Sequence, residues 1–383
     1  MIFKGTILMQ KTRVMFVVIQ LEAGGSERVV LDLARGLSQE KFEVYVTAFN
    51  GGVLEAPLRE ICKDVFIIEK SRRFDLSTML QLAKIVRKYR IDVVNPHHYM
   101  PCFYSFPGTR ILNRKKLIYT EHSVPEVEGI ASGKHGKILN MMLFRINAVV
   151  GVSREITVRF RERYPSHTDK FHEILNGVDI DKFNVKGTRN HVRKRWGLTN
   201  DHFVIGTVAN FRKVKNHACL VRAAVRLKDV YPQLRLLFVG TGFPGDPDNT
   251  EVEVRELILE LGLQDMIILT GYQENIPEML SAFDLFCLPS FSEGLPVSVL
   301  EAMAAGIPVV GSQVRGIKEV VHDRETGVMF FPNDDSDLSR ALEEILSNPS
   351  FGQTLANQAF NYVRKMHSKK AWVQKTSDLF FPG

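Results

Sequence analysis

The stretch SFSEGLPVSVLEAMAAGIPVVG, residues 290–311, decides the fold of the second half of the chain. Before it, the apolar run Asp284–Leu288 predicts a short buried strand. Pro296 suits the first position of a helix, because its missing N–H is not needed there, and Gly306 is typical of the residue that follows a helix. The apolar run Ile307–Val310 then predicts the next strand. This order of strand, loop, helix and strand is typical of α/β proteins.

Two carboxylates of this stretch occupy positions that favour a sugar nucleotide. Glu293 lies in the loop before the predicted helix, and Glu301 lies on the helix itself. The free N–H groups at a helix start favour an anion such as phosphate. A carboxylate beside a phosphate is unfavourable unless it accepts hydrogen bonds from neutral hydroxyls. A sugar joined to a diphosphate supplies both groups.

The pattern Ser-x-Glu-Gly-Leu-Pro, followed by Leu-Glu-Ala-Met-Ala-x-Gly-x-Pro-Val-Val, resembles the donor site of retaining GT-B glycosyltransferases of family GT4. Two glutamates at this spacing are common by chance, but the long motif in its strand, loop, helix and strand setting is specific. The resemblance implies that Glu293 holds hydroxyls of the donor sugar and Glu301 binds the ribose. It also implies that Gly294 and Leu295 border the nucleotide sugar.

A chain of 383 residues is too long for one compact core and predicts two domains. Helical segments such as Glu27–Leu37 alternate with apolar runs, which predicts an α/β fold with a doubly wound sheet in each half. Strands are expected at 13–20, 43–48, 65–68, 91–94, 117–120 and 148–152, and then at 203–208, 234–239, 266–270, 284–288 and 307–310.

The resemblance implies the GT-B architecture, in which two Rossmann-like domains face each other across an interdomain cleft. We expect an acceptor-side domain at 1–187, a nucleotide-sugar-binding domain at 188–366, and a helix at 367–383 that crosses back to the first domain. The polar segment Lys186–Lys194 predicts the linker, and Trp372 fits a last helix that packs on the first domain.

Two loops of the first half match the family. Gly24 and Gly25 follow the first strand and let backbone N–H groups approach a phosphate, although alone they predict only a tight turn. The resemblance implies that they border the donor diphosphate and the acceptor. His122 directly follows the strand 117–120, at the edge where α/β proteins bind ligands, and the resemblance implies that it faces the donor sugar. His97 and His98 also end a strand, and either could line the acceptor side.

The segment ANFRKVKNH, residues 209–217, resembles the family's loop in which an arginine and a lysine clamp the diphosphate. Two cations there neutralise the charge that grows on a nucleoside-diphosphate leaving group. The resemblance assigns Lys215 to the clamp. The usual arginine position holds Asn210, and Arg212 lies two residues later, which leaves the identity of the arginine open with Arg212 as the candidate.

GTGFPG at residues 240–245 matches the dinucleotide motif G-x-G-x-x-G. We reject that function because the preceding strand is not the first of its domain and because Pro244 and the polar run after it delay the helix. The resemblance implies instead that Gly240 turns the chain near the nucleotide, and Tyr272 is expected at the same site. The pairs Asp246-x-Asp248 and Asp179-x-Asp181 imitate a metal motif of another glycosyltransferase fold. We expect no metal and no cofactor beside the donor substrate.

The composition, 45% hydrophobic and 24% charged, is that of a globular protein. The four scattered cysteines indicate reduced thiols. No apolar run is long enough to cross a bilayer, and Met1–Gln10 lacks the features of a signal peptide. We therefore expect a cytoplasmic protein, with a peripheral position at the inner face of the cell membrane as the variant.

The positive charge lies in the first half. Residues 1–190 hold 30 Lys and Arg against 20 Asp and Glu, and residues 191–383 hold 20 against 23, so the net +7 is the sum of +10 and −3. Basic patches bind nucleic acid, anionic lipid or anionic substrates, or are merely solvated. No basic motif with interleaved aromatics supports nucleic acid. Clusters include Arg72, Arg73, Lys84, Arg87, Lys88, Arg90, Arg110, Arg114, Lys115 and Lys116.

The apolar segment 138–144, flanked by Lys134, Lys137 and Arg145, favours docking on an anionic leaflet. The alternative is that its large apolar side chains, Met141, Met142 and Phe144, are core residues of a helix.

The sequence thus predicts a retaining glycosyltransferase that moves a sugar from an NDP-sugar to a lipid-linked sugar or polysaccharide acceptor in surface glycan synthesis. One alternative is a GT-B UDP-sugar epimerase, against which the Gly24-Gly25 loop and the Glu293-Gly-Leu-Pro segment argue. Another is a nucleotide-sugar-binding protein without turnover, which the intact cations and carboxylates disfavour.

Overall fold

The computed structural model describes residues 11–22, 24–69, 74–123, 127, 129, 133–183, 187–243 and 245–381. The chain divides into two compact units, of which the first comprises Met1–Leu175 with Lys370–Gly383 and the second Asn176–Lys369. The expectations for Met1–Gln10, Arg72, Arg73, Pro244 and Lys186 lie outside the described residues.

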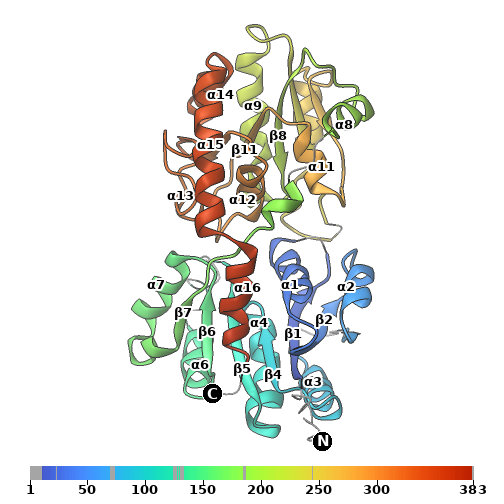
Figure 1. The fold of residues 1–383 in the computed structure, drawn as a ribbon, viewed down its shortest axis with the longest axis vertical. Helices are drawn as coiled ribbons and strands as arrows, with labels where there is room; N and C mark the ends of the chain where they lie inside the picture. Colours follow the sequence, from blue (N-terminus) through green and yellow to red (C-terminus); the bar gives the residue numbers. More distant parts are fainter. Residues whose placement is uncertain are drawn as a thin grey trace, which may run out of the picture. The chain divides into compact units, whose positions relative to one another are not determined.

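The first unit is built on a seven-stranded parallel sheet (Figure 1). Its strands, in spatial order, are β3 (Asp64–Ile67), β2 (Phe42–Asn50), β1 (Thr12–Gln20), β4 (Val93–Pro96), β5 (Lys116–Glu121), β6 (Ala148–Gly151) and β7 (Phe171–Glu173). Its helices are α1 (Gly25–Gly36), α2 (Glu55–Ile61), α3 (Leu76–Lys88), α4 (Tyr99–Phe106), the π-helix η1 (Pro107–Leu112), α6 (Lys134–Leu143), α7 (Arg154–Arg163), η2 (Pro165–Lys170) and α16 (Lys369–Asp378).

The second unit is built on a six-stranded parallel sheet. Its strands, in spatial order, are β10 (Ile267–Leu269), β9 (Leu234–Val239), β8 (Phe203–Val208), β11 (Leu285–Leu288), β12 (Val309–Ser312) and β13 (Val328–Phe330). Its helices are η3 (Ile180–Phe183), α8 (Arg189–Arg195), η4 (Lys213–Lys215), α9 (His217–Leu227), α10 (Glu251–Glu260), α11 (Ile276–Ser281), α12 (Val297–Ala304), α13 (Arg315–Lys318), α14 (Asp335–Leu346) and α15 (Pro349–Met366).

Buried apolar strands account for both sheets. The central run Val14–Val17 of β1 and all of β11 have no exposed surface, because helices cover both faces of a parallel sheet. The core of the second unit joins β11 and the other strands of its sheet to the apolar faces of α9, α10 and α14. The predicted doubly wound α/β fold is therefore confirmed.

Each sheet reverses its strand order at one point. In the first unit the reversal lies between β1 and β4, and in the second it lies between β8 and β11. Ligands of open α/β sheets bind outside the carboxyl ends of the strands at this topological switch point. The loops that follow these four strands are therefore where the functional side chains are expected.

Two short strands were not expected, and one expectation needs correction. Residues 171–173 and 328–330 form the edge strands β7 and β13, which the sequence pattern did not indicate. The predicted linker is in part the helix α8, whose Arg193 is buried because its guanidinium binds Asp284 at 2.6 Å. The polar segment that forms α8 is therefore part of the second unit and not a linker between the two domains.

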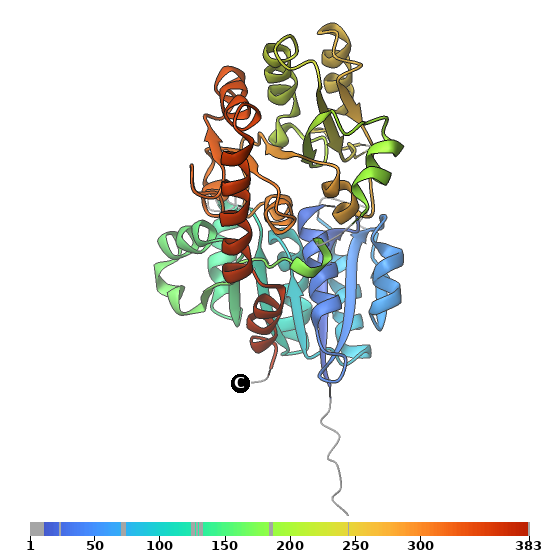
Figure 2. The ribbon, with the colours of Figure 1, turned by 45° about the horizontal axis from the view of Figure 1, so that its top comes forward.

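The unit boundary falls at residue 175, which differs from the expected boundary at residue 187. Two contacts tie the intervening residues to the end of α15: His367 Nδ1 lies 3.0 Å from the carbonyl oxygen of Asn176, and Val178 forms a β-bridge with Ser368. Beyond this point the chain enters the first unit as α16, which lies beside the first sheet in Figures 1 and 2. Phe380 packs there on Phe16.

Helix α6 shows both predicted environments at once. Met142 is buried, whereas Met141 and Phe144 are 59% and 69% exposed. The core interpretation therefore holds for one of the three side chains only. The four cysteines are free thiols, as expected, and no helix among the described residues is long and apolar enough to span a membrane.

Candidate active site

The loops after β8 and β11 bring a lysine and a glutamate together at the switch point of the second sheet. Lys215 Nζ lies 2.7 Å from Glu293 Oε1, and both side chains are largely buried. The buried Ser290 donates a hydrogen bond of 2.6 Å from its hydroxyl to the same carboxylate oxygen. The pair places a cation and a hydrogen-bond acceptor side by side at the carboxyl edge of the sheet.

Backbone contacts hold the two loops in register. The N–H of Phe291 donates to the carbonyl of Val214 at 2.8 Å, which joins the segment before Glu293 to the segment before Lys215. After Lys215 the chain turns through Asn216, whose φ of 51° is left-handed, and enters α9. Ser312 at the end of β12 donates its hydroxyl to the carbonyl of Ser290 at 2.5 Å. The position of Glu293 therefore depends on three strands.

Gly316 supports the same loop, and the sequence analysis missed it. A Cβ on Gly316 would lie 2.3 Å from the carbonyl oxygen of Glu293 and 2.5 Å from that of Gly294. Only a glycine allows α13 to approach this loop so closely. Its position soon after β12 was the available signal.

Helix α12 begins one residue later than predicted. Pro296 is the residue before the helix, and Gly306 follows its end with a φ of 70°, as a residue after a helix often does. Leu295 is buried and anchors the loop, and Gly294 lies between it and Glu293. Glu301 is half-buried on the fifth position of α12. Their roles toward a nucleotide sugar stay predictions.

Arg212 and Lys215 bind different partners: Arg212 binds two aspartates, whereas Lys215 binds Glu293. Its Nε lies 2.8 Å from Asp246 Oδ2, and its Nη2 lies 3.3 Å from Asp248 Oδ2. The pattern Asp246-x-Asp248, which imitates a metal motif, therefore binds an arginine side chain. Among the described residues, no group of three or more His, Cys, Asp or Glu side chains is placed to hold a metal ion.

Gly240 is needed at the end of β9. Its φ is 148°, and a Cβ there would lie 2.0 Å from the carbonyl oxygen of Ala209. The loop that follows ends on a carboxylate, because Glu251 Oε2 accepts the N–H of Gly242 at 2.7 Å. Burial opposes ionisation of Glu251, but this N–H and the Arg255 guanidinium lower its pKa overall. A carboxylate at the start of α10 disfavours a pyrophosphate there, in agreement with our rejection of the dinucleotide motif.

Tyr272 lies half-buried after β10.

The Gly24-Gly25 loop at the switch point of the first sheet also lies beside a carboxylate. Gly24 precedes α1, and Gly25 is its first residue. A Cβ on Gly24 would lie 2.2 Å from Glu27 Oε2, so glycine lets this carboxylate lie against the backbone. Ser26 donates to the same oxygen at 2.9 Å. The contact of these glycines with a diphosphate stays a prediction.

The carboxyl ends of β4 and β5 assemble three histidines. His97 Nδ1 lies 2.8 Å from His122 Nε2, and the two rings stack at 4.9 Å between centroids. Burial, with the neighbouring His98 as a smaller cause, lowers the pKa of His97 to about 3. Burial also lowers the pKa of His122 well below its usual value, with His97 and His98 as further causes. Both imidazoles are therefore neutral near pH 7, and each has one nitrogen that donates and one that accepts a hydrogen bond.

Glu121 organises this cluster, although the sequence analysis gave it no role. It has no exposed surface, and its Oε1 accepts the N–H groups of His122 and Ser123 at 2.8 and 2.9 Å. The same oxygen lies 3.2 Å from His98 Nδ1, and Tyr119 donates its hydroxyl to the other oxygen. Glu121 is thus a positioning residue for both histidines at its sides.

His98 is held in a backbone conformation that favours glycine. Its φ is 72° and its ψ is 162°, at the residue before α4. Such conformations cost about 1–3 kcal/mol and persist where surrounding contacts impose them, often at functional sites. The contact with Glu121 is one such constraint. His98 therefore belongs to the candidate site beside His122.

Two family models match the chain, Glycosyltransferase Family 4 over residues 23–182 and Glycosyl transferases group 1 over residues 188–366. The N-acetyl-alpha-D-glucosaminyl L-malate synthase of Bacillus anthracis is 23% identical over 370 residues, which are 94% of each chain. The UDP-Gal:alpha-D-GlcNAc-diphosphoundecaprenol alpha-1,3-galactosyltransferase of Escherichia coli is 23% identical over 377 residues, 93% of each chain.

Solved structures share the fold. The crystal structure of Anabaena HepE in complex with UDP and glucose superposes with a TM-score of 0.85 and 20% identity, over 96% of this chain and 98% of that one. WaaG, a glycosyltransferase involved in lipopolysaccharide biosynthesis, superposes with a TM-score of 0.77 and 16% identity, over 97% and 100%. With a family model on each half and relatives that span nearly its full length, the chain belongs to glycosyltransferase family 4 and is a glycosyltransferase with the GT-B fold.

Proposed function

We propose that this glycosyltransferase takes a sugar from an NDP-sugar and transfers it with retention of the anomeric configuration. The contact between Lys215 and Glu293 carries the proposal. A diphosphate needs a cation, and the hydroxyls of its sugar need an acceptor a few ångströms away. These two side chains supply both groups at the switch point of one sheet, where such sheets bind ligands.

Donor binding replaces this ion pair with contacts to the substrate. Lys215 turns to the diphosphate and neutralises the charge that develops as the bond to the anomeric carbon breaks. Glu293, still held by Ser290, accepts hydrogen bonds from sugar hydroxyls. Glu301 binds the ribose hydroxyls. Arg212 exchanges its aspartates for the diphosphate, which gives the second cation of the clamp.

In this proposal the departing phosphate takes the proton of the acceptor hydroxyl on the face from which it leaves. No protein carboxylate forms a covalent bond to the sugar, and no metal takes part. His122 is neutral near pH 7, so it orients a sugar hydroxyl by a hydrogen bond and does not act as a cation. Glu121 holds the backbone N–H of His122, and His97 contacts its ring.

Two measurements test this proposal. A ligand at about 100 times its Kd raises stability by about 2.7 kcal/mol, so thermal unfolding with UDP-, GDP- and ADP-sugars identifies the donor. NMR of the product from an α-linked donor then reads the anomeric configuration. We expect an α linkage and unchanged activity after treatment with a chelator. A β linkage, or loss of activity with the chelator, contradicts the mechanism.

We further propose that the acceptor is a lipid-linked sugar or growing polysaccharide and that the first unit docks on an anionic membrane. The name of the Escherichia coli relative describes a sugar-diphosphoundecaprenol acceptor. Among the described residues of the first unit, seven large apolar side chains are between 55% and 69% exposed, and four of them lie on η1 or at the end of α6: Ile111, Leu112, Met141 and Phe144. We call these four residues the apolar surface.

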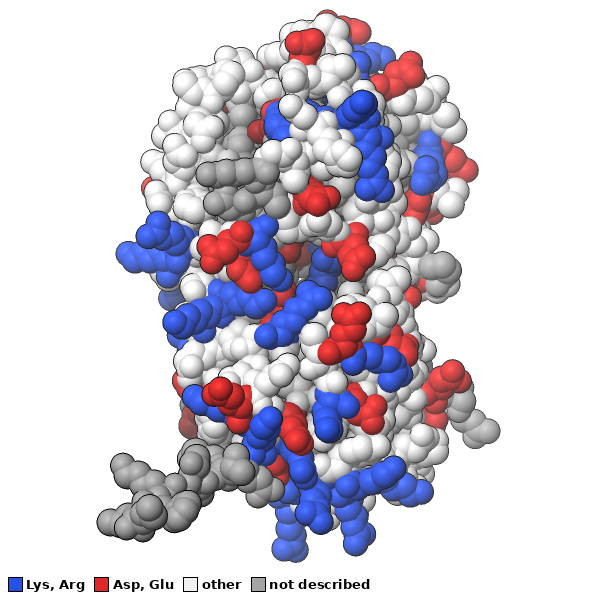
Figure 3. Space-filling view, turned by 45° about the vertical axis from the view of Figure 1, so that its right-hand side comes forward, with Lys and Arg blue, Asp and Glu red and all other residues white. Residues whose placement is uncertain are grey.

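Basic residues connect and flank the apolar surface. Arg110 Nε donates to the carbonyl of Arg145 at 2.6 Å, which ties η1 to the end of α6. Lys137 and Arg114 are exposed nearby in sequence. Lys and Arg side chains also gather at the lower end of the view in Figure 3, on the first unit. Each such cation near an anionic surface contributes about 1 kcal/mol, and buried apolar side chains add to this.

Sedimentation with vesicles tests the docking. We expect binding to phosphatidylglycerol vesicles at low salt, weak binding to phosphatidylcholine vesicles, and several-fold weaker binding of a Met141→Ser, Phe144→Ser variant. Val230→Ser, which removes a comparably exposed side chain of the second unit, is the matched control. Equal sedimentation with both lipids would favour a soluble acceptor.

A further inference from the structure

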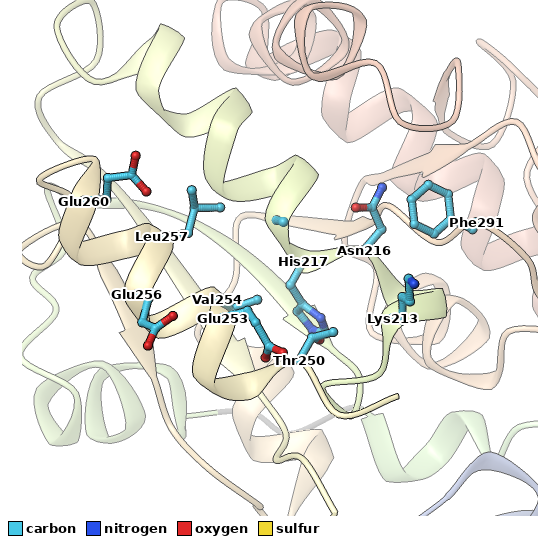
Figure 4. Close-up of a pocket in the computed structure, with 11 residues that line it drawn as sticks. Lys213, Asn216, His217, Thr250, Glu253, Val254, Glu256, Leu257, Glu260 and Phe291 are labelled. Atoms are coloured by element: carbon cyan, nitrogen blue, oxygen red, sulfur yellow. The ribbon is translucent and has the colours of Figure 1, made fainter. Parts of the chain in front are cut away.

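A pocket of about 330 Å³ opens between α9 and α10 in the second unit, and its lining includes none of the proposed donor-binding groups. Figure 4 shows how its walls are arranged. The start of α9 lies at the centre, one face of α10 forms one side, and Lys213 with Phe291 forms the other.

Two buried polar side chains of this lining each have one nitrogen without a hydrogen-bond partner among the described residues. Asn216 is 7% exposed and His217 is 2% exposed. Neither Asn216 Nδ2 nor His217 Nδ1 has a hydrogen-bond partner among the residues that the structure describes. Burial lowers the pKa of His217 to about 3, and Lys215 contributes, so the imidazole is neutral. A buried polar group without a partner is destabilising, and a ligand that hydrogen-bonds to it relieves this cost.

The charges of the pocket are separated across it. Glu253, Glu256 and Glu260 line it from α10, and within the described part of the chain they form no ion pair. Lys213 lies on the opposite side from Glu256 and Glu260 in Figure 4. The first N–H groups of α9, which have no acceptor within a helix, add positive potential at the centre.

Apolar side chains accompany both charged sides: Val254 and Leu257 on α10, and Phe291 beside Lys213. Val254 is buried, Leu257 is half-buried, and Phe291 presents an exposed ring. A ligand that fits this lining carries an ammonium group at one end, a carboxylate at the other and a small apolar body. A ligand with only an amine would leave Lys213 and Asn216 without a partner. A ligand with only a carboxylate would be repelled by the glutamates of α10.

We propose that this pocket binds a free amino acid as a zwitterion. Its ammonium group contacts the carboxylates of α10. Its carboxylate accepts hydrogen bonds from the Asn216 amide, Lys213 and the start of α9. An apolar side chain packs on Leu257 and Phe291.

The ligand would also act on the donor site, and this second part rests on the proposed function. Lys213 and Lys215 belong to the same short helix, η4. The N–H of Phe291 binds the carbonyl of Val214 between these lysines. A ligand that contacts Lys213 and Phe291 therefore contacts the two segments that carry Lys215 and Glu293. Occupancy changes the affinity for the nucleotide.

Titration calorimetry with the full chain tests the site. The probes are L-leucine and two analogues with the same apolar body: isoamylamine, which lacks the carboxylate, and isocaproate, which lacks the ammonium group. We expect saturable leucine binding and at least about tenfold weaker binding of each analogue, since each loses charge-assisted hydrogen bonds. If none of the standard amino acids binds with a Kd below on the order of 10 mM, or if the analogues bind as tightly as leucine, the proposal is wrong.

Variants locate the binding. Glu256→Gln should weaken leucine binding about tenfold, whereas Glu325→Gln, the same charge change on an exposed turn before β13, should leave it unchanged. Ala218→Phe should fill the pocket and abolish binding, with thermal unfolding as the check of its fold. Equal effects of the two glutamine substitutions would rule out this pocket.

The coupling has its own measurement. The affinity of whichever of UDP, GDP or ADP binds is determined with and without saturating leucine. We expect a several-fold change in the parent and none in Ala218→Phe. An unchanged affinity in the parent contradicts the coupling. Failure of leucine and of every other standard amino acid to bind contradicts the site and leaves the proposed transferase function unaffected.

Discussion

The carboxyl edges of the two sheets follow the same topology but carry opposite chemistry. In the second unit the switch-point loops carry ionised groups, with Lys215 on Glu293 and Arg212 on Asp246. In the first unit the corresponding edge carries neutral imidazoles, with the buried His97 stacked on the half-buried His122. One fold supplies the position in both units, and the side chains decide what each position binds.

The difference follows from what each edge has to hold. A diphosphate carries charge that grows during transfer, so its site needs cations that exchange partners readily. Hydroxyl groups carry no charge, so they are oriented by neutral donors and acceptors that keep fixed places. The ion pairs of the second edge are therefore expected to respond to substrate, whereas the histidine cluster of the first edge is expected to respond to pH.

The largest effect is expected at the second edge. Lys215→Ala should lower kcat about 10²–10³-fold, the range for one lost group that stabilises developing charge. Initial rates with the donor identified by the thermal screen measure it. Lys194→Ala, at an exposed lysine of α8, is the control and should keep full activity. A Lys215→Ala enzyme with the parent's turnover would remove this lysine from the clamp.

The pH dependence of stability comes next and concerns the first edge. His97 has a pKa of about 3 in the folded chain and near 6.5 when unfolded, so it takes up a proton only on unfolding below pH 6.5. Stability should fall as pH decreases from 6.5 toward 3, by about 1.4 kcal/mol per pH unit for this residue. Thermal unfolding of His97→Gln between pH 7 and about 4.5 should show a shallower decline.

The control for that measurement is His191→Gln, which changes an exposed histidine of α8. It should leave the decline of the unfolding temperature with pH as it is in the parent. If His97→Gln and the parent lose stability in parallel, the imidazole of His97 is not held neutral by burial.

A glycine tests how far the second edge depends on backbone packing. Gly316→Ala places a Cβ against the carbonyls of Glu293 and Gly294, so it should displace the loop and raise the donor KM about tenfold. Gly352→Ala is the matched control, because its Cβ meets the side chain of Ile345 at 2.9 Å and no backbone atom. An unchanged KM in Gly316→Ala would show that Glu293 tolerates movement of its loop.

The smallest effect is expected in the test of whether Arg212 is the arginine that binds the donor diphosphate. Asp246→Asn weakens one ion pair that holds Arg212, whose side chain is 41% exposed, so donor affinity should rise only about threefold. Arg212→Ala should lower donor affinity. If both substitutions leave the affinity unchanged, Arg212 is a structural residue of its loop and the clamp has a single cation from this segment.

The sequence predicted the strands whose side chains are apolar on both faces, because burial on both faces leaves a continuous apolar run. β11 and β8 are examples. It did not predict β7 or β13, since three residues are too short to show a pattern. It assigned α8 to a linker because the segment is polar, yet Asp284 binds Arg193 there and makes its burial possible.

Of the candidate site, the sequence by itself determined the residue types and the loops. Lys215, Glu293, Gly240 and His122 each follow an apolar run, and the family pattern connected them to donor chemistry. The tertiary structure alone decided which of them meet. Lys215 contacts a glutamate 78 residues away because β8 and β11 are neighbours in the sheet. Strand order is set by the packing of whole elements, which no local pattern records.

The same reason explains the residues that only the structure revealed. Glu121 is an ordinary carboxylate in the sequence, and it becomes the centre of a buried cluster because β4 and β5 end side by side. Gly316 matters because α13 is packed against a loop from which α12 and β12 separate it in the sequence. Apolar periodicity specifies which segments are buried, whereas contacts between polar groups depend on the order in which those segments pack.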